Sequence, residues 1–108
     1  RVGGWVYVGF LGISPWHREP GEFDRAVLRG MARAESGQVL GWRRATLGDF
    51  EGVVSQFVEE GTAIREWYVR HGAIMLYITY SCEEENAGMD DAAVDELLDT
   101  LLLVPAEA

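Results

Sequence analysis

Residues 38–81 constrain the fold most strongly, because strand-like segments there alternate with pairs of turn-forming residues. The expected strands are Gln38–Leu47, Phe50–Glu59, Ala63–Arg70 and Ala73–Ser81. The expected turns are Gly48-Asp49, Glu60-Gly61 and His71-Gly72. Two-residue connections that contain glycine supply the positive φ that right-twisted hairpins need. This stretch therefore predicts a meander of four antiparallel strands.

Two-residue turns also fix the register, and the register assigns each side chain to one face of the sheet. The His71-Gly72 turn would set Trp67 opposite Leu76 and Tyr68 opposite Met75. One face then collects large apolar side chains and is expected to be core: Leu47, Phe50, Val54, Val58, Trp67, Val69, Ile74, Leu76, Ile78 and Tyr80.

The second face is mixed in character. At one end, Leu40, Phe57 and Ile64 form an apolar cluster that a helix could cover. The other end is aromatic and charged, and it is the candidate binding surface: Trp42, Arg44, Glu66, Tyr68, Arg70 and Tyr77. Aromatic residues with Arg are typical of interface hot spots. The alternative is a half-solvated sheet face that is stabilised by cross-strand pairs such as Glu51–Arg70.

Further elements flank the meander. The apolar run Trp5–Ile13 predicts a strand that is buried on both faces. Apolar residues at helical spacing predict a helix over 22–35, with a buried stripe of Phe23, Ala26, Val27, Gly30, Met31 and Ala34. Within this stripe, Gly30 would mark close packing on the sheet. A second helix is expected over 90–103, with Asp90 as its N-cap and with a stripe that covers the apolar face: Val94, Leu97, Leu98, Leu101 and Leu102.

The order of expected elements is therefore β-α-β-β-β-β-α in a single domain of residues 1–108. This order predicts an α+β fold, in which helices pack on an antiparallel sheet of four to five strands to give an arrangement like an α/β/α sandwich.

Charge narrows the class of partner. The chain has a net charge of −9, and all nine of its cations are Arg. This balance argues against a nucleic-acid partner, because contacts to phosphates need clustered cations. It is compatible with a basic protein partner. No apolar run reaches the roughly 20 residues of a membrane span. We expect a cytoplasmic location, although export stays open because the sequence begins at Arg1.

Residues that could carry chemistry are few. Cys82 is the only cysteine, so neither an internal disulfide nor a cysteine-based zinc cluster can form. His17 and His71 are the only histidines and lie far apart in the sequence. The acidic residues of 83–91 lack the pattern of a calcium loop. The sequence therefore predicts no cofactor, no metal site and no catalytic residues.

The pattern of strands and helices resembles the PsbP-like α/β/α sandwich superfamily. The resemblance covers roughly residues 5–103, and its best-matching segments are Asp49-Phe50-Glu51-Gly52, Arg65-Glu66-Trp67-Tyr68-Val69 and Tyr77-Ile78-Thr79-Tyr80-Ser81. That superfamily includes photosystem II accessory proteins and many small bacterial proteins. The resemblance implies a binding or accessory role rather than catalysis.

Three functional hypotheses follow. The first is a non-catalytic binding or accessory module that recognises a protein partner through the aromatic-charged end of the second face. The second is an acidic immunity or inhibitor protein that neutralises a basic toxin or enzyme through residues 83–91. The third is an enzyme, which would need a pocket that holds perturbed carboxylates or His71.

Overall fold

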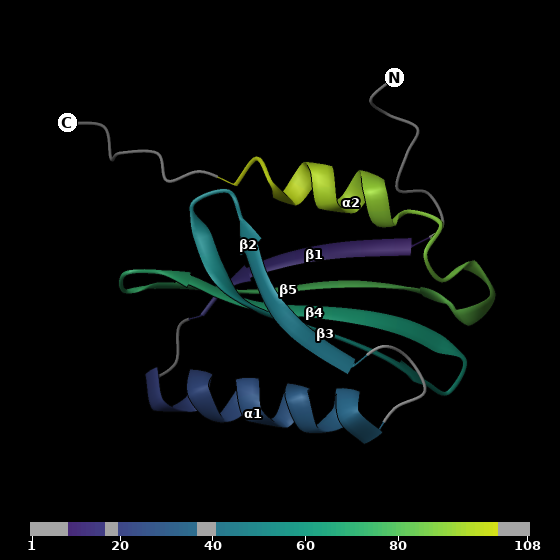
Figure 1. The fold of residues 1–108 in the computed structure, drawn as a ribbon, viewed down its shortest axis with the longest axis horizontal. Coiled ribbons are helices and arrows are strands. Elements are labelled where there is room, and N and C mark those ends of the chain that lie inside the picture. Colours follow the sequence, from purple (N-terminus) through teal and green to yellow (C-terminus); the bar gives the residue numbers. More distant parts are fainter. Residues whose placement is uncertain (1–8, 17–19, 37–40, 102–108) are drawn as a thin grey trace.

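The computed structural model describes residues 9–16, 20–36 and 41–101. It is an α+β fold, in which a five-stranded antiparallel sheet has α1 on one face and α2 on the other (Figure 1). The elements are β1 Gly9–Pro15, α1 Pro20–Ser36, β2 Gly41–Leu47, β3 Phe50–Glu59, β4 Thr62–His71, β5 Ile74–Glu83, a 3-10 turn Glu84–Asn86 and α2 Asp91–Leu98. The sheet order is β1-β5-β4-β3-β2, so the predicted meander and the predicted order of elements are confirmed.

Two of the three predicted turns are confirmed in position and register. Leu47 pairs with Phe50 across Gly48-Asp49, and Val54 pairs with Trp67 across the turn at Glu60-Gly61. In the second turn, Glu60 and Gly61 both have positive φ, at 50° and 81°, as a type I′ hairpin requires.

The third turn was predicted wrongly. It is Gly72-Ala73 rather than His71-Gly72, so Trp67 faces Ile78 and not Leu76. Gly72 has a φ of 59°, which suits the first central position of a type II′ turn, where glycine is favoured. The pairing shifts by two residues, an even number. Every side chain of β5 therefore stays on its predicted face of the sheet.

The predicted apolar face is the larger core and lies under α2. Val94 and Leu98 of α2 are fully buried against Trp67 and Ile78. Three details differ from expectation. Leu97 and Ile74 are 38% and 46% exposed, and α2 ends at Leu98, where the expected helix continued. The last expected stripe residue, at position 102, lies outside the described residues.

Helix α1 packs on the opposite face and begins two residues before its expected start. Its predicted apolar stripe is confirmed, since Phe23, Ala26 and Ala34 are buried. Close packing at Gly30 is also confirmed, because a Cβ at this position would lie 2.9 Å from Cε1 of Tyr68. The glycine therefore lets the helix approach the sheet more closely than alanine would.

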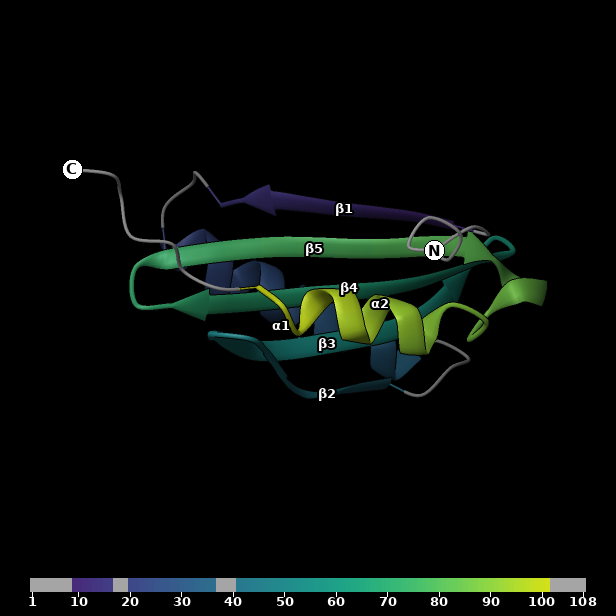
Figure 2. The same cartoon turned by 90° about the horizontal axis from the view of Figure 1, so that it is seen from above.

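Strand β1 corrects another expectation. It lies at the edge of the sheet beside β5, and Phe10 is 82% exposed, so the described part of the strand is not buried on both faces (Figure 2). Residues 5–8 of the expected strand, and Leu40 of the expected apolar cluster, lie outside the described residues. Across the ranges that the structure describes, no helix is both long and apolar enough to cross a membrane.

Candidate functional site

The six residues of the candidate surface fall into two groups. Glu66 and Tyr68 are buried beneath α1, at 4% exposure each. Tyr77 is half-buried beside them and packs against the same cluster. The other three side chains, Trp42, Arg44 and Arg70, are exposed. One continuous exposed surface is therefore a wrong expectation.

The reason is the path of α1. The sequence suggested that this helix would rest on the apolar cluster that includes Phe57. It does reach that end, where the Arg33 guanidinium lies 5.0 Å from the centre of the Phe57 ring. Its first half, however, packs Phe23 against Tyr68. The helix consequently covers the middle of the second face as well as its apolar end.

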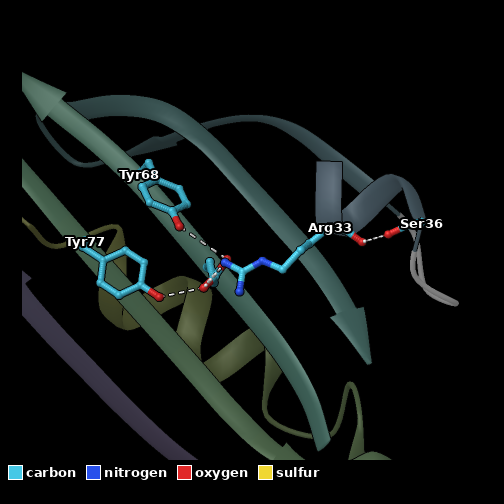
Figure 3. A network of polar contacts seen from close by, with 5 residues as sticks. Arg33, Ser36, Tyr68 and Tyr77 are labelled. Atoms are coloured by element: carbon cyan, nitrogen blue, oxygen red, sulfur yellow. Dashed lines mark hydrogen bonds and ion pairs between the residues drawn. The ribbon is translucent and has the colours of Figure 1, made fainter. Parts of the chain in front are cut away.

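The buried Glu66 carboxylate is the centre of a polar cluster beneath α1, and its partners Arg33, Tyr68 and Tyr77 are labelled in Figure 3. Arg33 of α1 donates from Nη2 to both oxygens of the Glu66 carboxylate, at 3.0 and 3.1 Å. The Tyr77 hydroxyl donates to Oε2 at 2.6 Å. The Tyr68 hydroxyl lies 3.5 Å from Oε1, at the outer limit of a hydrogen bond. Arg33 of the helix thus neutralises the charge of the carboxylate, and hydroxyl groups of the sheet add hydrogen bonds to it.

The phenols of this cluster are poor acids. Burial and the hydrogen bond to Glu66 raise the pKa of Tyr77 well above its ordinary value of 10.0. Burial and the negative charge of Glu66 raise the pKa of Tyr68 as well. Both hydroxyls therefore stay protonated near neutral pH and serve as donors. An anchored carboxylate of this kind suits a structural clamp between α1 and β4 better than a general base.

Beside α1, an open groove of about 550 Å³ runs over the β2 end of the second face. We call it the β2 groove and define it by its main lining residues: Met31, Trp42, Arg44, Glu51, Val53 and Arg70. Three of the six predicted surface residues, Trp42, Arg44 and Arg70, therefore do come together. The groove exists because α1 crosses the sheet without covering β2 completely.

The β2 groove combines a fixed aromatic ring with uncommitted charges. Trp42 donates from Nε1 to Glu35 at 2.9 Å, which orients its ring at the rim. Arg44 and Arg70 form no hydrogen bond or ion pair with the residues that the structure describes. Glu51 faces Arg70 across the strands, as predicted, but no ion pair joins them. The two guanidinium groups are thus available to a ligand.

On the other face of the sheet, Arg65 ties α2 in place, a role that the sequence analysis missed. Its guanidinium pairs with Asp91 at 3.3 Å and with Asp95 at 2.7 Å, and it lies 4.5 Å from the centre of the Trp67 ring. A usable signal was present, since an Arg on the predicted core face needs a partner. Two carboxylates four residues apart on the covering helix could supply one.

The remaining candidates for chemistry are modest. Cys82 is buried, and burial raises the pKa of its thiol, so it is a poor nucleophile. His71 contacts the carbonyl of Asp49 through Nδ1 at 2.9 Å, and His17 lies outside the described residues. Asp90 occupies the N-cap position of α2, as expected, but its side chain makes no capping hydrogen bond. Its carboxylate instead accepts a hydrogen bond from the Tyr80 hydroxyl. No group of three metal-ligating residues occurs in the described part of the chain.

Comparisons with known proteins give little further information. No protein-family model matches the chain. The search of curated proteins finds no match either. Among solved structures, the chain is similar to the crystal structure of PA94, a protein of unknown function from Pseudomonas aeruginosa. The two are 16% identical, with a TM-score of 0.49, and the alignment covers 96% of this chain and 89% of that one.

Proposed function

We propose that this protein is a non-catalytic binding or accessory module that recognises a protein partner through the β2 groove. The observation that carries the proposal is the pair of uncommitted guanidinium groups, Arg44 and Arg70, beside an exposed and oriented Trp42. Trp and Arg are enriched among residues that dominate binding energy at interfaces. Met31 and Val53 add apolar surface to the groove, which a partner side chain could bury.

The chemistry of the groove favours a partner segment that carries carboxylates. Guanidinium groups bind carboxylates through paired N–H donors in a fixed planar geometry. Among the residues that line the groove, Arg44 and Arg70 outnumber the single carboxylate, Glu51. A second carboxylate, Glu35, lies at the rim and already accepts the hydrogen bond from Trp42. A segment that places an acidic side chain next to an aromatic or aliphatic one would satisfy both the charge and the apolar surface.

The polar cluster around Glu66 holds one wall of the β2 groove in place. Glu66 lies opposite Ser55 in the sheet and is held by Arg33 from the helix that forms one wall of the groove. The wall and the floor are therefore fixed relative to each other before a partner arrives. Preorganisation of this kind reduces the entropy lost on binding.

A peptide library displayed on phage provides a test that does not require the natural partner to be identified first. We expect selection against the protein to enrich acidic sequences that also contain an apolar residue. Synthetic versions of these peptides should bind at least about tenfold more weakly to Trp42→Ala and Arg44→Gln, as loss of a hot-spot contact requires. The matched control is Arg25→Gln, which removes an exposed arginine of α1 that does not line the groove.

Two outcomes would contradict different parts of the proposal. Enriched peptides that lack carboxylates but still depend on Trp42 would keep the surface and reject the acidic partner. Peptides that bind Trp42→Ala and Arg44→Gln as tightly as the original protein would reject the surface itself.

An acidic immunity or inhibitor protein is the second candidate, and the distribution of charge favours it. Between residues 83 and 99 the chain has eight carboxylates and no cation. Asp91 and Asp95 remain 40% and 52% exposed at their side chains even though Arg65 binds both. Association with a basic toxin encoded beside the gene should then slow steeply as salt is added. An association rate that salt does not change would exclude this candidate.

The PsbP-like resemblance is compatible with either candidate. The order of elements and the sandwich of two helices around a sheet support it. We propose it as a relationship of fold, and it agrees with a binding role rather than a catalytic one.

A further inference from the structure

We propose that a second copy of this chain pairs with the open edge of β1, so that two sheets join into one across a two-fold axis. The two edges of the sheet differ in composition. Strand β2 carries two consecutive charged residues, Arg43 and Arg44, whereas β1 contains no charged residue. Charges on edge strands prevent unwanted pairing with other strands, so an uncharged edge is open to pairing.

Side chains on β1 point to the same conclusion. Phe10 is 82% exposed and Ile13 is 45% exposed, on a strand of only seven residues. Phe10 lies on the α1 face, opposite Ser81, and Ile13 lies on the α2 face, opposite Ile78. Both faces of the edge therefore present a large apolar group to solvent.

The backbone groups of β1 that point away from the sheet can be identified. Trp16, directly after β1, donates its N–H to the carbonyl of Met75 at 2.8 Å. Because hydrogen-bonded pairs recur at every second residue of an antiparallel ladder, Ser14, Gly12 and Phe10 also bond to β5. The N–H and C=O groups of Gly9, Leu11 and Ile13 consequently point outward, ready for another strand.

The sequence of β1 complements itself about Leu11. In an antiparallel pair centred there, Leu11 meets Leu11 of the second copy and Ile13 meets Gly9. Phe10 meets Gly12 of the second copy. Each large exposed side chain would thus lie beside a glycine, and each glycine would accept the bulk that it lacks. A two-fold interface requires self-complementarity of this kind.

Gly9 and Gly12 differ in whether contacts within one chain require a glycine at that position. A Cβ at Gly9 would lie 2.4 Å from the carbonyl oxygen of Ser81, so packing within the chain already requires glycine there. At Gly12 the nearest atom would be Thr79 Oγ1 at 3.5 Å, an ordinary contact. Nothing in the described part of the chain therefore requires Gly12 to be glycine, and the open space beside it could receive the Phe10 ring of a second copy.

Pairing through β1 has a consequence for the proposed function. Strands β1 and β2 occupy opposite edges of the sheet, as Figure 2 shows. A two-fold axis perpendicular to the joined sheet would place both α1 helices on the same face. The two β2 grooves would then lie at the two far edges of the joined sheet and open toward the same face. A partner with two acidic segments could bind both grooves at once.

Molar mass measured by light scattering over a range of concentrations tests the proposal. The original protein should form a dimer. Phe10→Arg should fold but remain monomeric, since the Phe10 side chain is 82% exposed and a charge on an edge strand disfavours pairing with another strand. Ile13→Pro, which removes an outward N–H without touching the ladder to β5, should weaken association at least about tenfold. Thr46→Val, at an exposed site on the other edge strand, is the matched control and should leave the dimer unchanged.

Thermal unfolding of each variant shows whether the monomer itself is intact. A dimer that is lost in Phe10→Arg and Ile13→Pro, while Phe10→Arg still unfolds in a single cooperative transition, would support the pairing. An original protein that is monomeric at every concentration would overturn it. A dimer that persists in both variants would overturn it equally, because association would then use another surface. These results are independent of whether any peptide binds the β2 groove.

Discussion

The Tyr77 hydroxyl offers the sharpest test of the view that the buried cluster is a structural clamp. Tyr77→Phe removes the donor that lies 2.6 Å from Glu66 Oε2 and leaves the ring in place. Tyr68→Phe removes a hydroxyl that lies 3.5 Å from Oε1 of the same carboxylate. The two substitutions are chemically identical and share one acceptor group. They differ in the length of the contact.

The distances set the expected magnitudes. A hydrogen bond to a charged acceptor contributes about 1.5–3 kcal/mol to the free energy of unfolding. We expect the lower half of this range for Tyr77→Phe, because Tyr77 is half-buried and water can partly replace the lost donor. For Tyr68→Phe we expect less than about 0.5 kcal/mol, since a contact of 3.5 Å is at the limit of hydrogen bonding.

Urea unfolding followed by circular dichroism measures the free energy of unfolding of each variant. The comparison is valid if the slope of that free energy against urea concentration is the same in the variants as in the original protein. A double-mutant cycle with Glu66→Gln separates the contact from other effects of the substitution. With a neutral acceptor, the cost of Tyr77→Phe should fall to about 0.5–1 kcal/mol. Equal costs for the two tyrosines, or no coupling between Tyr77 and Glu66, would refute the clamp.

Two further predictions concern stability. Gly30→Ala should destabilise the protein in urea unfolding even though alanine favours a helix by about 1 kcal/mol, because the added Cβ meets the Tyr68 ring at 2.9 Å; a gain in stability would contradict the packing. Raising the pH should also destabilise it. Since the pKa of Tyr77 is higher in the folded chain than its ordinary 10.0, its contribution is complete below about pH 10 and is lost as the pH rises toward the folded value. Tyr77→Phe should reduce this loss in unfolding curves measured at alkaline pH.

The faces of the sheet could be predicted from the sequence because they depend on local features. Side chains alternate with a period of two, and glycines such as Gly48 and Gly61 mark where the chain turns. An error of one position at His71-Gly72 had no effect on the faces, because the true turn at Gly72-Ala73 shifts the pairing by two residues.

The path of each helix across the sheet could not be predicted in the same way. Helical periodicity identifies the buried stripe of α1, and Phe23 and Ala26 were assigned correctly. Periodicity does not give the angle or the position at which that stripe crosses the strands. The edge position of β1 was missed for a similar reason, since an uninterrupted apolar run in the sequence does not distinguish a buried strand from an exposed edge strand.

The candidate surface is divided into a buried and an exposed part because only some of its charged residues have an oppositely charged partner on α1. Arg33 of α1 reaches Glu66, so the helix can bury that carboxylate without leaving it unpaired. Arg44 and Arg70 have no acidic partner on α1 among the described residues, and covering them would have buried uncompensated charge. The helix therefore covers the part of the face whose charge it can neutralise and leaves the rest open. Arg44 and Arg70 thus remain exposed without an ion-pair partner in the described part of the chain, and this makes the β2 groove the part of the second face to test for binding.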